Sequence, residues 1–205
     1  QEVSLISILR ERKSVVLYAL VGGFGSFVYA QFNYLLPLNM ESLYGAKGAE
    51  IFGLLTSVNA LVVILATPLV TTFLGKIRDV KKLLIGQTLI VLGLYSYRYV
   101  QLQMALYFLL MVIFTIGEVF KTLGEQPYMT RRIPATHWGR VNSFVSIVSG
   151  AFSSVGNLFL GRLLDSQGYS AAWLAVGLAG IGLIILAYLL SETDKKAFPL
   201  LYAEN

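Results

Sequence analysis

Residues 171–190 read AAWLAVGLAGIGLIILAYLL and contain no charged side chain. A helix of about 20 apolar residues is long enough to cross the hydrocarbon core of a membrane, which is about 30 Å thick. Five further runs without charge occur in the chain, at 14–40, 51–75, 83–97, 99–117 and 141–161. The sequence therefore predicts a membrane protein made of helices.

The composition excludes an ordinary soluble domain. The chain of 205 residues is 56% hydrophobic and 13% charged, with a mean hydropathy of +0.70, whereas soluble domains carry about 25% charged residues. We predict an all-α membrane protein in which 1–13 is the end of a cytoplasmic linker, 14–192 a six-helix transmembrane bundle and 193–205 a cytoplasmic tail. The expected helices are 14–40, 49–76, 82–101, 103–131, 139–163 and 169–191.

The placement of Lys and Arg predicts the orientation of the bundle. Of the 16 basic residues, 12 fall in the two terminal segments and in the loops after the second and fourth helices, and only Lys47, Arg98 and Arg162 fall on the opposite side. Because cytoplasmic loops carry the excess of Lys and Arg, both termini are expected in the cytoplasm. We therefore attribute the net charge of +5 to contact with the lipid bilayer, and we expect no nucleic-acid partner.

A short repeat indicates internal symmetry. The segment FLGKIRD at Phe73–Asp79 returns as FLGRLLD at Phe159–Asp165. One copy ends the second expected helix on the inner side and the other ends the fifth on the outer side, so helices one to three and four to six are expected to be inverted repeats, as in many secondary transporters. A chance match of a short apolar motif is the alternative.

Three charged residues lie inside the fourth expected helix. Glu118, Lys121 and Glu125 are spaced i, i+3 and i+7, which puts them on one helix face with each carboxylate about one turn from the ammonium. A charge at this depth is costly unless it meets a partner or water, and nearby water or charge changes how tightly a carboxyl holds a proton. We therefore assign these residues to proton coupling; a permanent ion pair that only fixes packing is the alternative. Glu125 has a second alternative, a gate formed with Arg131 or Arg132.

Polar side chains of the first helix are candidates for substrate binding. The candidates are Gln31, Asn33 and Tyr34, with Tyr29 nearby, whose amides and phenols can orient a substrate. Ordinary packing is an equal alternative for Gln31 and Asn33 and the favoured interpretation for Tyr34. Asn59, Asn142 and Asn157 are interpreted as interhelical hydrogen bonds. The chain has no cysteine and one histidine, and neither a Walker nor a G-x-S-x-G motif. We therefore expect no metal, no cofactor and no enzyme.

Several of these motifs resemble the carboxyl-terminal six-helix half of a major facilitator superfamily transporter. Gly75-x-x-x-Asp79, followed by Lys81 and Lys82, is similar to that family's loop motif, with Val80 and Lys82 at positions where the family has arginine and a second glycine. The segments 31–37 (QFNYLLP) and 115–118 (TIGE) resemble the seventh and tenth helices of its drug:proton antiporters.

The resemblance implies a function and a partner. In similar antiporters the acid that matches Glu118 takes part in proton and drug binding, whereas Lys121 departs from them and favours an anionic or zwitterionic substrate. The chain is expected to be half of a proton-coupled exporter of amphipathic small molecules in a bacterial inner or plasma membrane, completed by an amino-terminal six-helix half. A peptide or metabolite symporter half and a six-helix homodimeric carrier or channel are the alternatives.

Overall fold

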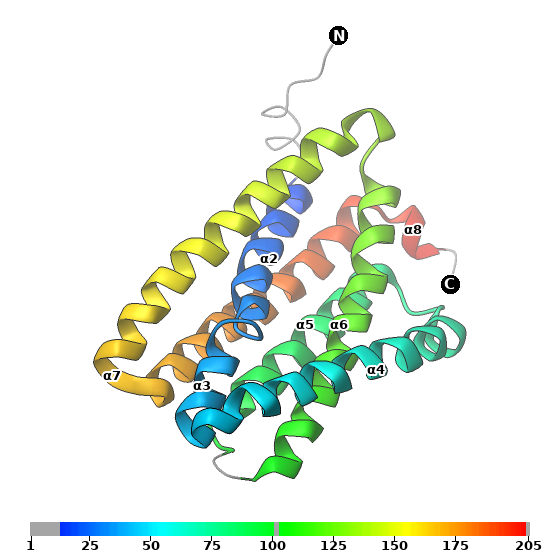
Figure 1. Ribbon diagram of the computed structural model, residues 1–205. Coiled ribbons are helices and arrows are strands. Elements are labelled where there is room, and N and C mark those ends of the chain that lie inside the picture. Colours follow the sequence, from blue (N-terminus) through cyan, green and yellow to red (C-terminus); the bar gives the residue numbers. More distant parts are fainter. Residues whose placement is uncertain (1–12, 101–102, 204–205) are drawn as a thin grey trace.

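The computed structural model describes residues 13–100 and 103–203, and every regular element within these ranges is a helix (Figure 1). The linker end expected before Lys13 and the helix end expected at Gln101 lie outside the described residues. The elements in chain order are α2 (Lys13–Ala30), α3 (Leu35–Tyr44), the 3-10 turn η1 (Gly45–Lys47), α4 (Gly48–Leu74), α5 (Asp79–Ser96), α6 (Met104–Arg132), the 3-10 turn η2 (Ala135–His137), α7 (Trp138–Ala197) and α8 (Leu200–Ala203).

The first expected helix is broken between α2 and α3. Residues 31–34 form a turn in which the N–H groups of Asn33 and Tyr34 both donate to the carbonyl of Ala30, at 3.1 and 3.0 Å. Pro37 lies one turn further along the chain. Because proline has no N–H and its ring crowds the carbonyl four residues earlier, the helix is disrupted on the amino-terminal side of Pro37. The bend that Pro37 predicts therefore falls one turn before it.

The longest helix changes direction at one glycine. α7 is helical on both sides of Gly168, whose φ of 78° and ψ of −178° are readily adopted only by glycine. The two parts, 138–167 and 169–197, run in opposite directions in Figure 1, in yellow and orange. A loop is expected at 164–168, but residues 164–167 are helical and only Gly168 departs from helical backbone angles. Ser166 stays in the helix by donating its hydroxyl to the carbonyl of Arg162 at 2.8 Å.

The two copies of the repeated segment differ in local structure. Phe73–Asp79 contains the last residues of α4, a turn at 75–78 and the first residue of α5, whereas Phe159–Asp165 is helical throughout. The first copy ends on the first residue of α5, and the second ends three residues before the change of direction at Gly168. The inverted relation between the two halves of the chain stays a prediction.

Glycines bring the backbones of α5 and α6 into contact. A Cβ added to Gly117 would lie 2.8 Å from both the carbonyl oxygen of Gly86 and the nitrogen of Ile90, and a Cβ on Gly86 would collide with the backbone of Lys121. Only glycine permits this approach. The contact fixes the position of α6 along α5 directly beside the charged residues of α6.

Three helical stretches are long and apolar enough to cross a membrane: Lys13–Leu74, Met104–Arg132 and Ala135–Ala197. This indicates a membrane protein. α5 is not among them because three of its 18 residues, Asp79, Lys81 and Lys82, are charged. Its length corresponds to about 27 Å at 1.5 Å per residue. The helix ends at Ser96, so its expected continuation through 97–100 is wrong.

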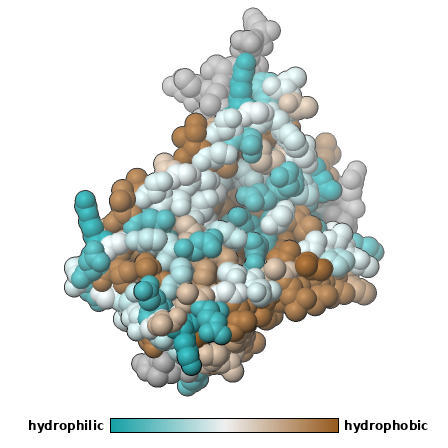
Figure 2. Space-filling view, viewed as in Figure 1, coloured by the Kyte–Doolittle hydropathy of each residue, from teal (hydrophilic) through white to brown (hydrophobic). Residues whose placement is uncertain are grey.

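Large apolar side chains remain exposed along α4 and the first part of α7. Ile64 is 69% exposed and Phe73 76% on α4, and Ile147 and Leu158 are each 70% exposed on α7. Figure 2 shows hydrophobic residues gathered along the edge that α4 forms in Figure 1. Since apolar surface of this extent is costly in water, these faces require contact with lipid or with other protein.

Candidate functional site

Glu118 lies at the centre of α6 and is held by two other helices. Its Oε1 accepts a hydrogen bond of 2.6 Å from the hydroxyl of Tyr29 on α2, and its Oε2 accepts one of 2.9 Å from the amide of Asn59 on α4. Asn59 also donates to the hydroxyl of Thr115 at 2.9 Å, one turn before Glu118. The half-buried carboxylate thus joins α2, α4 and α6 through neutral donors.

The neighbouring ammonium is paired elsewhere. The Nζ of Lys121 lies 3.8 Å from the carboxylate of Glu125 and 5.3 Å from the centre of the Tyr29 ring. Among the described residues Lys121 forms no ion pair with Glu118, so the expectation that it lies between two carboxylates is wrong. The two side chains have different partners: Lys121 pairs with Glu125, four residues later on the same helix, whereas the carboxylate of Glu118 is bound by residues of α2 and α4.

The three substrate-binding candidates of the first helix are not brought together. Gln31 is fully buried and donates to the carbonyl of Phe27 at 2.7 Å and to the side chain of Asn157 at 2.8 Å, so it connects α2 to α7. Asn33 is exposed at the turn, and the hydroxyl of Tyr34 lies close to Gly161. Gln31 therefore has a packing role, and the polar group that faces Glu118 from this segment is Tyr29 instead.

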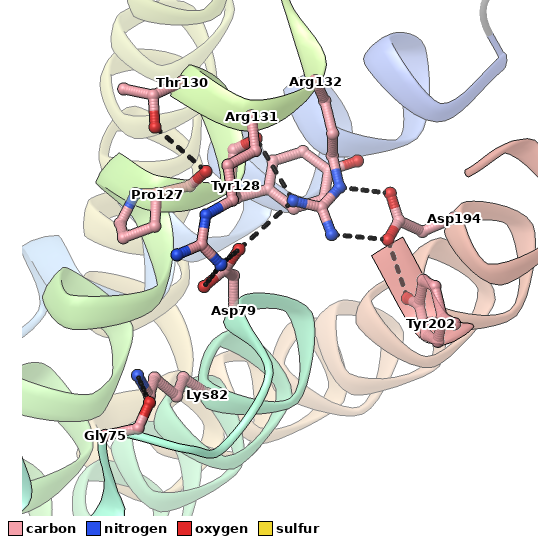
Figure 3. A network of polar contacts seen from close by, with 10 residues as sticks. All are labelled: Gly75, Asp79, Lys82, Pro127, Tyr128, Thr130, Arg131, Arg132, Asp194 and Tyr202. Carbon is pink, nitrogen blue, oxygen red and sulfur yellow. Dashed lines mark hydrogen bonds and ion pairs between the residues drawn. The ribbon is translucent and has the colours of Figure 1, made fainter. Parts of the chain in front are cut away.

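A second polar cluster joins α5, α6, α7 and α8 at one end of the bundle (Figure 3). Arg132 binds Asp194 through Nε at 2.5 Å and Nη2 at 2.7 Å, and its Nη1 lies 3.3 Å from Asp79. Arg131 binds the same Asp79 at 3.1 Å, and Tyr202 donates its hydroxyl to Asp194 at 2.7 Å. Asp194 is completely buried.

This cluster changes the interpretation of several charged residues. Arg131 and Arg132 both bind Asp79, while the carboxylate of Glu125 lies 3.8 Å from Lys121; a gate formed by Glu125 with either arginine stays a prediction. Asp194 is three residues beyond the end expected for the sixth helix, in the segment assigned to a cytoplasmic tail, but α7 continues to Ala197 and buries it. Burial, reinforced by the hydrogen bond to Asp194, raises the pKa of Tyr202 to about 12.

The loop-motif residues occupy the turn between α4 and α5. Asp79 is the first residue of α5 and is buried, and Lys81 is exposed. Lys82 was expected as a loop cation but is only 8% exposed, and its Nζ donates to the carbonyl of Gly75 at 3.1 Å. The motif therefore closes its own turn through Lys82 and anchors α5 to α6 through Asp79.

Sequence reasoning interpreted Asn59 and Asn157 as interhelical hydrogen-bond donors or acceptors, and this is confirmed. It did not assign Asn59 or Tyr29 to the Glu118 site. The signal that was available is Asn59 itself, the one amide side chain in α4, because an amide within a membrane helix needs a hydrogen-bond partner on another helix.

Comparisons with protein-family models, curated proteins and solved structures find no match to this chain.

Proposed function

We propose that this chain is the carboxyl-terminal half of a proton-coupled secondary transporter that exports amphipathic small molecules by alternating access. The observation that carries the proposal is the Glu118 carboxylate, which is half-buried among apolar helices, is held by Tyr29 and Asn59, and forms no ion pair with any residue that the structure describes. An acid in this position is the kind of group that transporters use to bind a proton.

Proton binding at Glu118 would be linked to helix position. The hydroxyl of Tyr29 and the amide of Asn59 donate to an ionised carboxylate more strongly than to a neutral one. Protonation therefore weakens the two contacts that join α6 to α2 and α4. Separation of these helices and proton uptake favour each other, which is the reciprocity that coupling requires.

The charges of the site favour a cationic substrate. Lys121 is matched by Glu125, so with all three groups ionised the set of Glu118, Lys121 and Glu125 has one negative charge in excess. A positively charged amphipathic molecule and a proton would compete for this charge, as antiport requires. The pairing of Lys121 removes the reason for expecting an anionic or zwitterionic substrate.

The exposed apolar faces support a partner. α4 and the first part of α7 leave large side chains such as Ile64 and Ile147 uncovered, and a second six-helix half packed there would bury them. Six membrane helices in two inverted triplets, with both termini in the cytoplasm, belong to this proposal. Native mass of the full gene product separates it from a homodimer of a six-helix protein.

The test is transport by the full gene product in vesicles under an imposed pH gradient, with a fluorescent amphipathic cation as the probe. Glu118→Gln is expected to abolish the gradient-driven movement, because the amide cannot take up a proton. Glu50→Gln is the matched control, since Glu50 is an exposed acid in the first turn of α4. Gradient-driven transport that survives Glu118→Gln, with unchanged pH dependence, refutes the role of Glu118.

A further inference from the structure

A cavity of about 530 Å³ lies beside the polar cluster at the end of the bundle, away from Glu118. One wall is the turn before α5 with the first residues of that helix, a second is the end of α6, and the third is α8. Its volume is within the range of about 300 to 1,000 Å³ that small-molecule sites occupy. The lining residues are Gly75, Lys76, Ile77, Arg78, Asp79, Lys82, Pro127, Arg131, Arg132, Leu201 and Tyr202.

The lining is strongly basic. It contains five basic side chains and one carboxylate, that of Asp79. Asp79 already accepts hydrogen bonds from Arg131 and Arg132 (Figure 3). Within the described residues the remaining three cations, Lys76, Arg78 and Lys82, form no ion pair, so the charge left over in the cavity is positive.

Lys82 gives the clearest sign of a missing ligand. The residue is 8% exposed, and its ammonium has one protein acceptor within the described residues, the carbonyl of Gly75 at 3.1 Å. An ammonium has three donors, and a buried charge is costly unless it is paired. The two unused donors border a cavity that an anion can enter.

Arg78 lies on the same wall as Lys82, at the last residue before α5, and contacts Tyr202 of α8. Its guanidinium lies 4.6 Å from the centre of the Tyr202 ring and donates to the carbonyl of that residue at 3.4 Å. Stacking fixes the plane of the guanidinium, and a fixed guanidinium matches the oxygens of a phosphate group well.

We propose that this cavity binds a phosphate-bearing anion, held by Arg78, Lys82 and Lys76. Two sources have this chemistry: the headgroup of an anionic phospholipid, which basic pockets at the ends of membrane helices attract, and a soluble phosphate. The proposal does not depend on transport through Glu118.

Binding to the full gene product tests it. The protein is placed in nanodiscs of phosphatidylcholine alone and of phosphatidylcholine with phosphatidylglycerol. Native mass spectrometry measures the retained phosphatidylglycerol, and calorimetry measures binding of inorganic phosphate in the nanodiscs without phosphatidylglycerol. Retention of phosphatidylglycerol alone identifies a lipid as the source, binding of phosphate alone identifies a soluble anion, and binding of both supports the shared chemistry. Absence of both overturns the proposal.

Variants locate the binding. The double variant Lys76→Gln with Arg78→Gln is expected to weaken it about tenfold, since each cation near the anion contributes. Arg78→Lys keeps the charge but loses the planar guanidinium that stacks on Tyr202, and its affinity is expected to fall between those of the wild type and the double variant. Lys47→Gln removes an exposed cation from η1, which does not line the cavity, and is expected to have no effect. An equal loss in Lys47→Gln and the double variant overturns the assignment to this cavity.

Discussion

Replacing Arg132 by methionine removes the cation that lies between two buried carboxylates. Asp194 is completely buried and accepts hydrogen bonds of 2.5 and 2.7 Å from Arg132, so the variant leaves it without a cation among the described residues and with neutral donors such as the hydroxyl of Tyr202 at 2.7 Å. Asp79 is affected less because Arg131 remains 3.1 Å away. Removing one partner of a buried ion pair costs about 3 to 5 kcal/mol, and nearly all of this cost is expected to come from Asp194.

The adjacent arginine provides the control. The side chain of Arg131 is 61% exposed, and exposed ion pairs contribute about 0 to 1 kcal/mol. The free energy of unfolding of the detergent-solubilised gene product is measured by titration with a denaturing detergent, for Arg132→Met and Arg131→Met. The two values are expected to differ by at least about 2 kcal/mol.

A second substitution checks the cause. Arg132→Met combined with Asp194→Leu removes both charges, and replacing a buried ion pair by apolar residues is often neutral. The double variant is therefore expected to recover most of the lost stability. If Arg132→Met is no less stable than Arg131→Met, or if Asp194→Leu brings no recovery, the network is not a source of stability and the reasoning fails.

Three further predictions concern single positions. Tyr29→Phe removes the hydrogen bond of 2.6 Å to Glu118 and is expected to lower the free energy of unfolding by about 1.5 to 3 kcal/mol; no change in denaturing-detergent titrations would show that the bond is not formed. Gly168→Ala places a Cβ at a φ of 78° and is expected to cost about 1 to 3 kcal/mol, seen as a lower melting temperature, with Gly139→Ala, on ordinary helical backbone, as the neutral control. Tyr202 has a pKa raised to about 12 against about 10 when unfolded, so its stabilising contribution is present below pH 10 and lost as the pH rises through 12. The difference in stability between the wild type and Tyr202→Phe is expected to shrink over that interval, and a difference that grows contradicts the sign.

The sequence predicts the helices well where charge marks their ends. Residues 49–76 and 103–131 were expected as helices and correspond closely to α4 and α6, because Glu50, Lys76, Arg131 and Arg132 stand near the limits of long apolar runs. The reversal at Gly168 falls inside the expected loop at 164–168, but the polar residues Asp165, Ser166 and Gln167 that suggest a loop continue the helix up to the glycine.

The partners of the charged residues were harder to predict. The spacing along α6 correctly predicts that Lys121 and Glu125 are neighbours. It also suggests a pair between Lys121 and Glu118, but these two side chains have other partners. The bonds from Tyr29 and Asn59 join residues that are 89 and 59 positions away from Glu118. Likewise, Asp194 meets Arg132 across 62 positions, and no local pattern contains that information.

The glycine contact between α5 and α6 has a mechanical consequence. Because the backbone of Gly86 lies against that of Gly117 and Lys121, a larger side chain at either glycine would push the two helices apart. Glu118 directly follows Gly117, so the acid lies at the point of closest approach between α5 and α6. A change in the angle between these helices would therefore pivot beside Glu118 and would move their far ends, where Asp79 and Arg132 lie, the most.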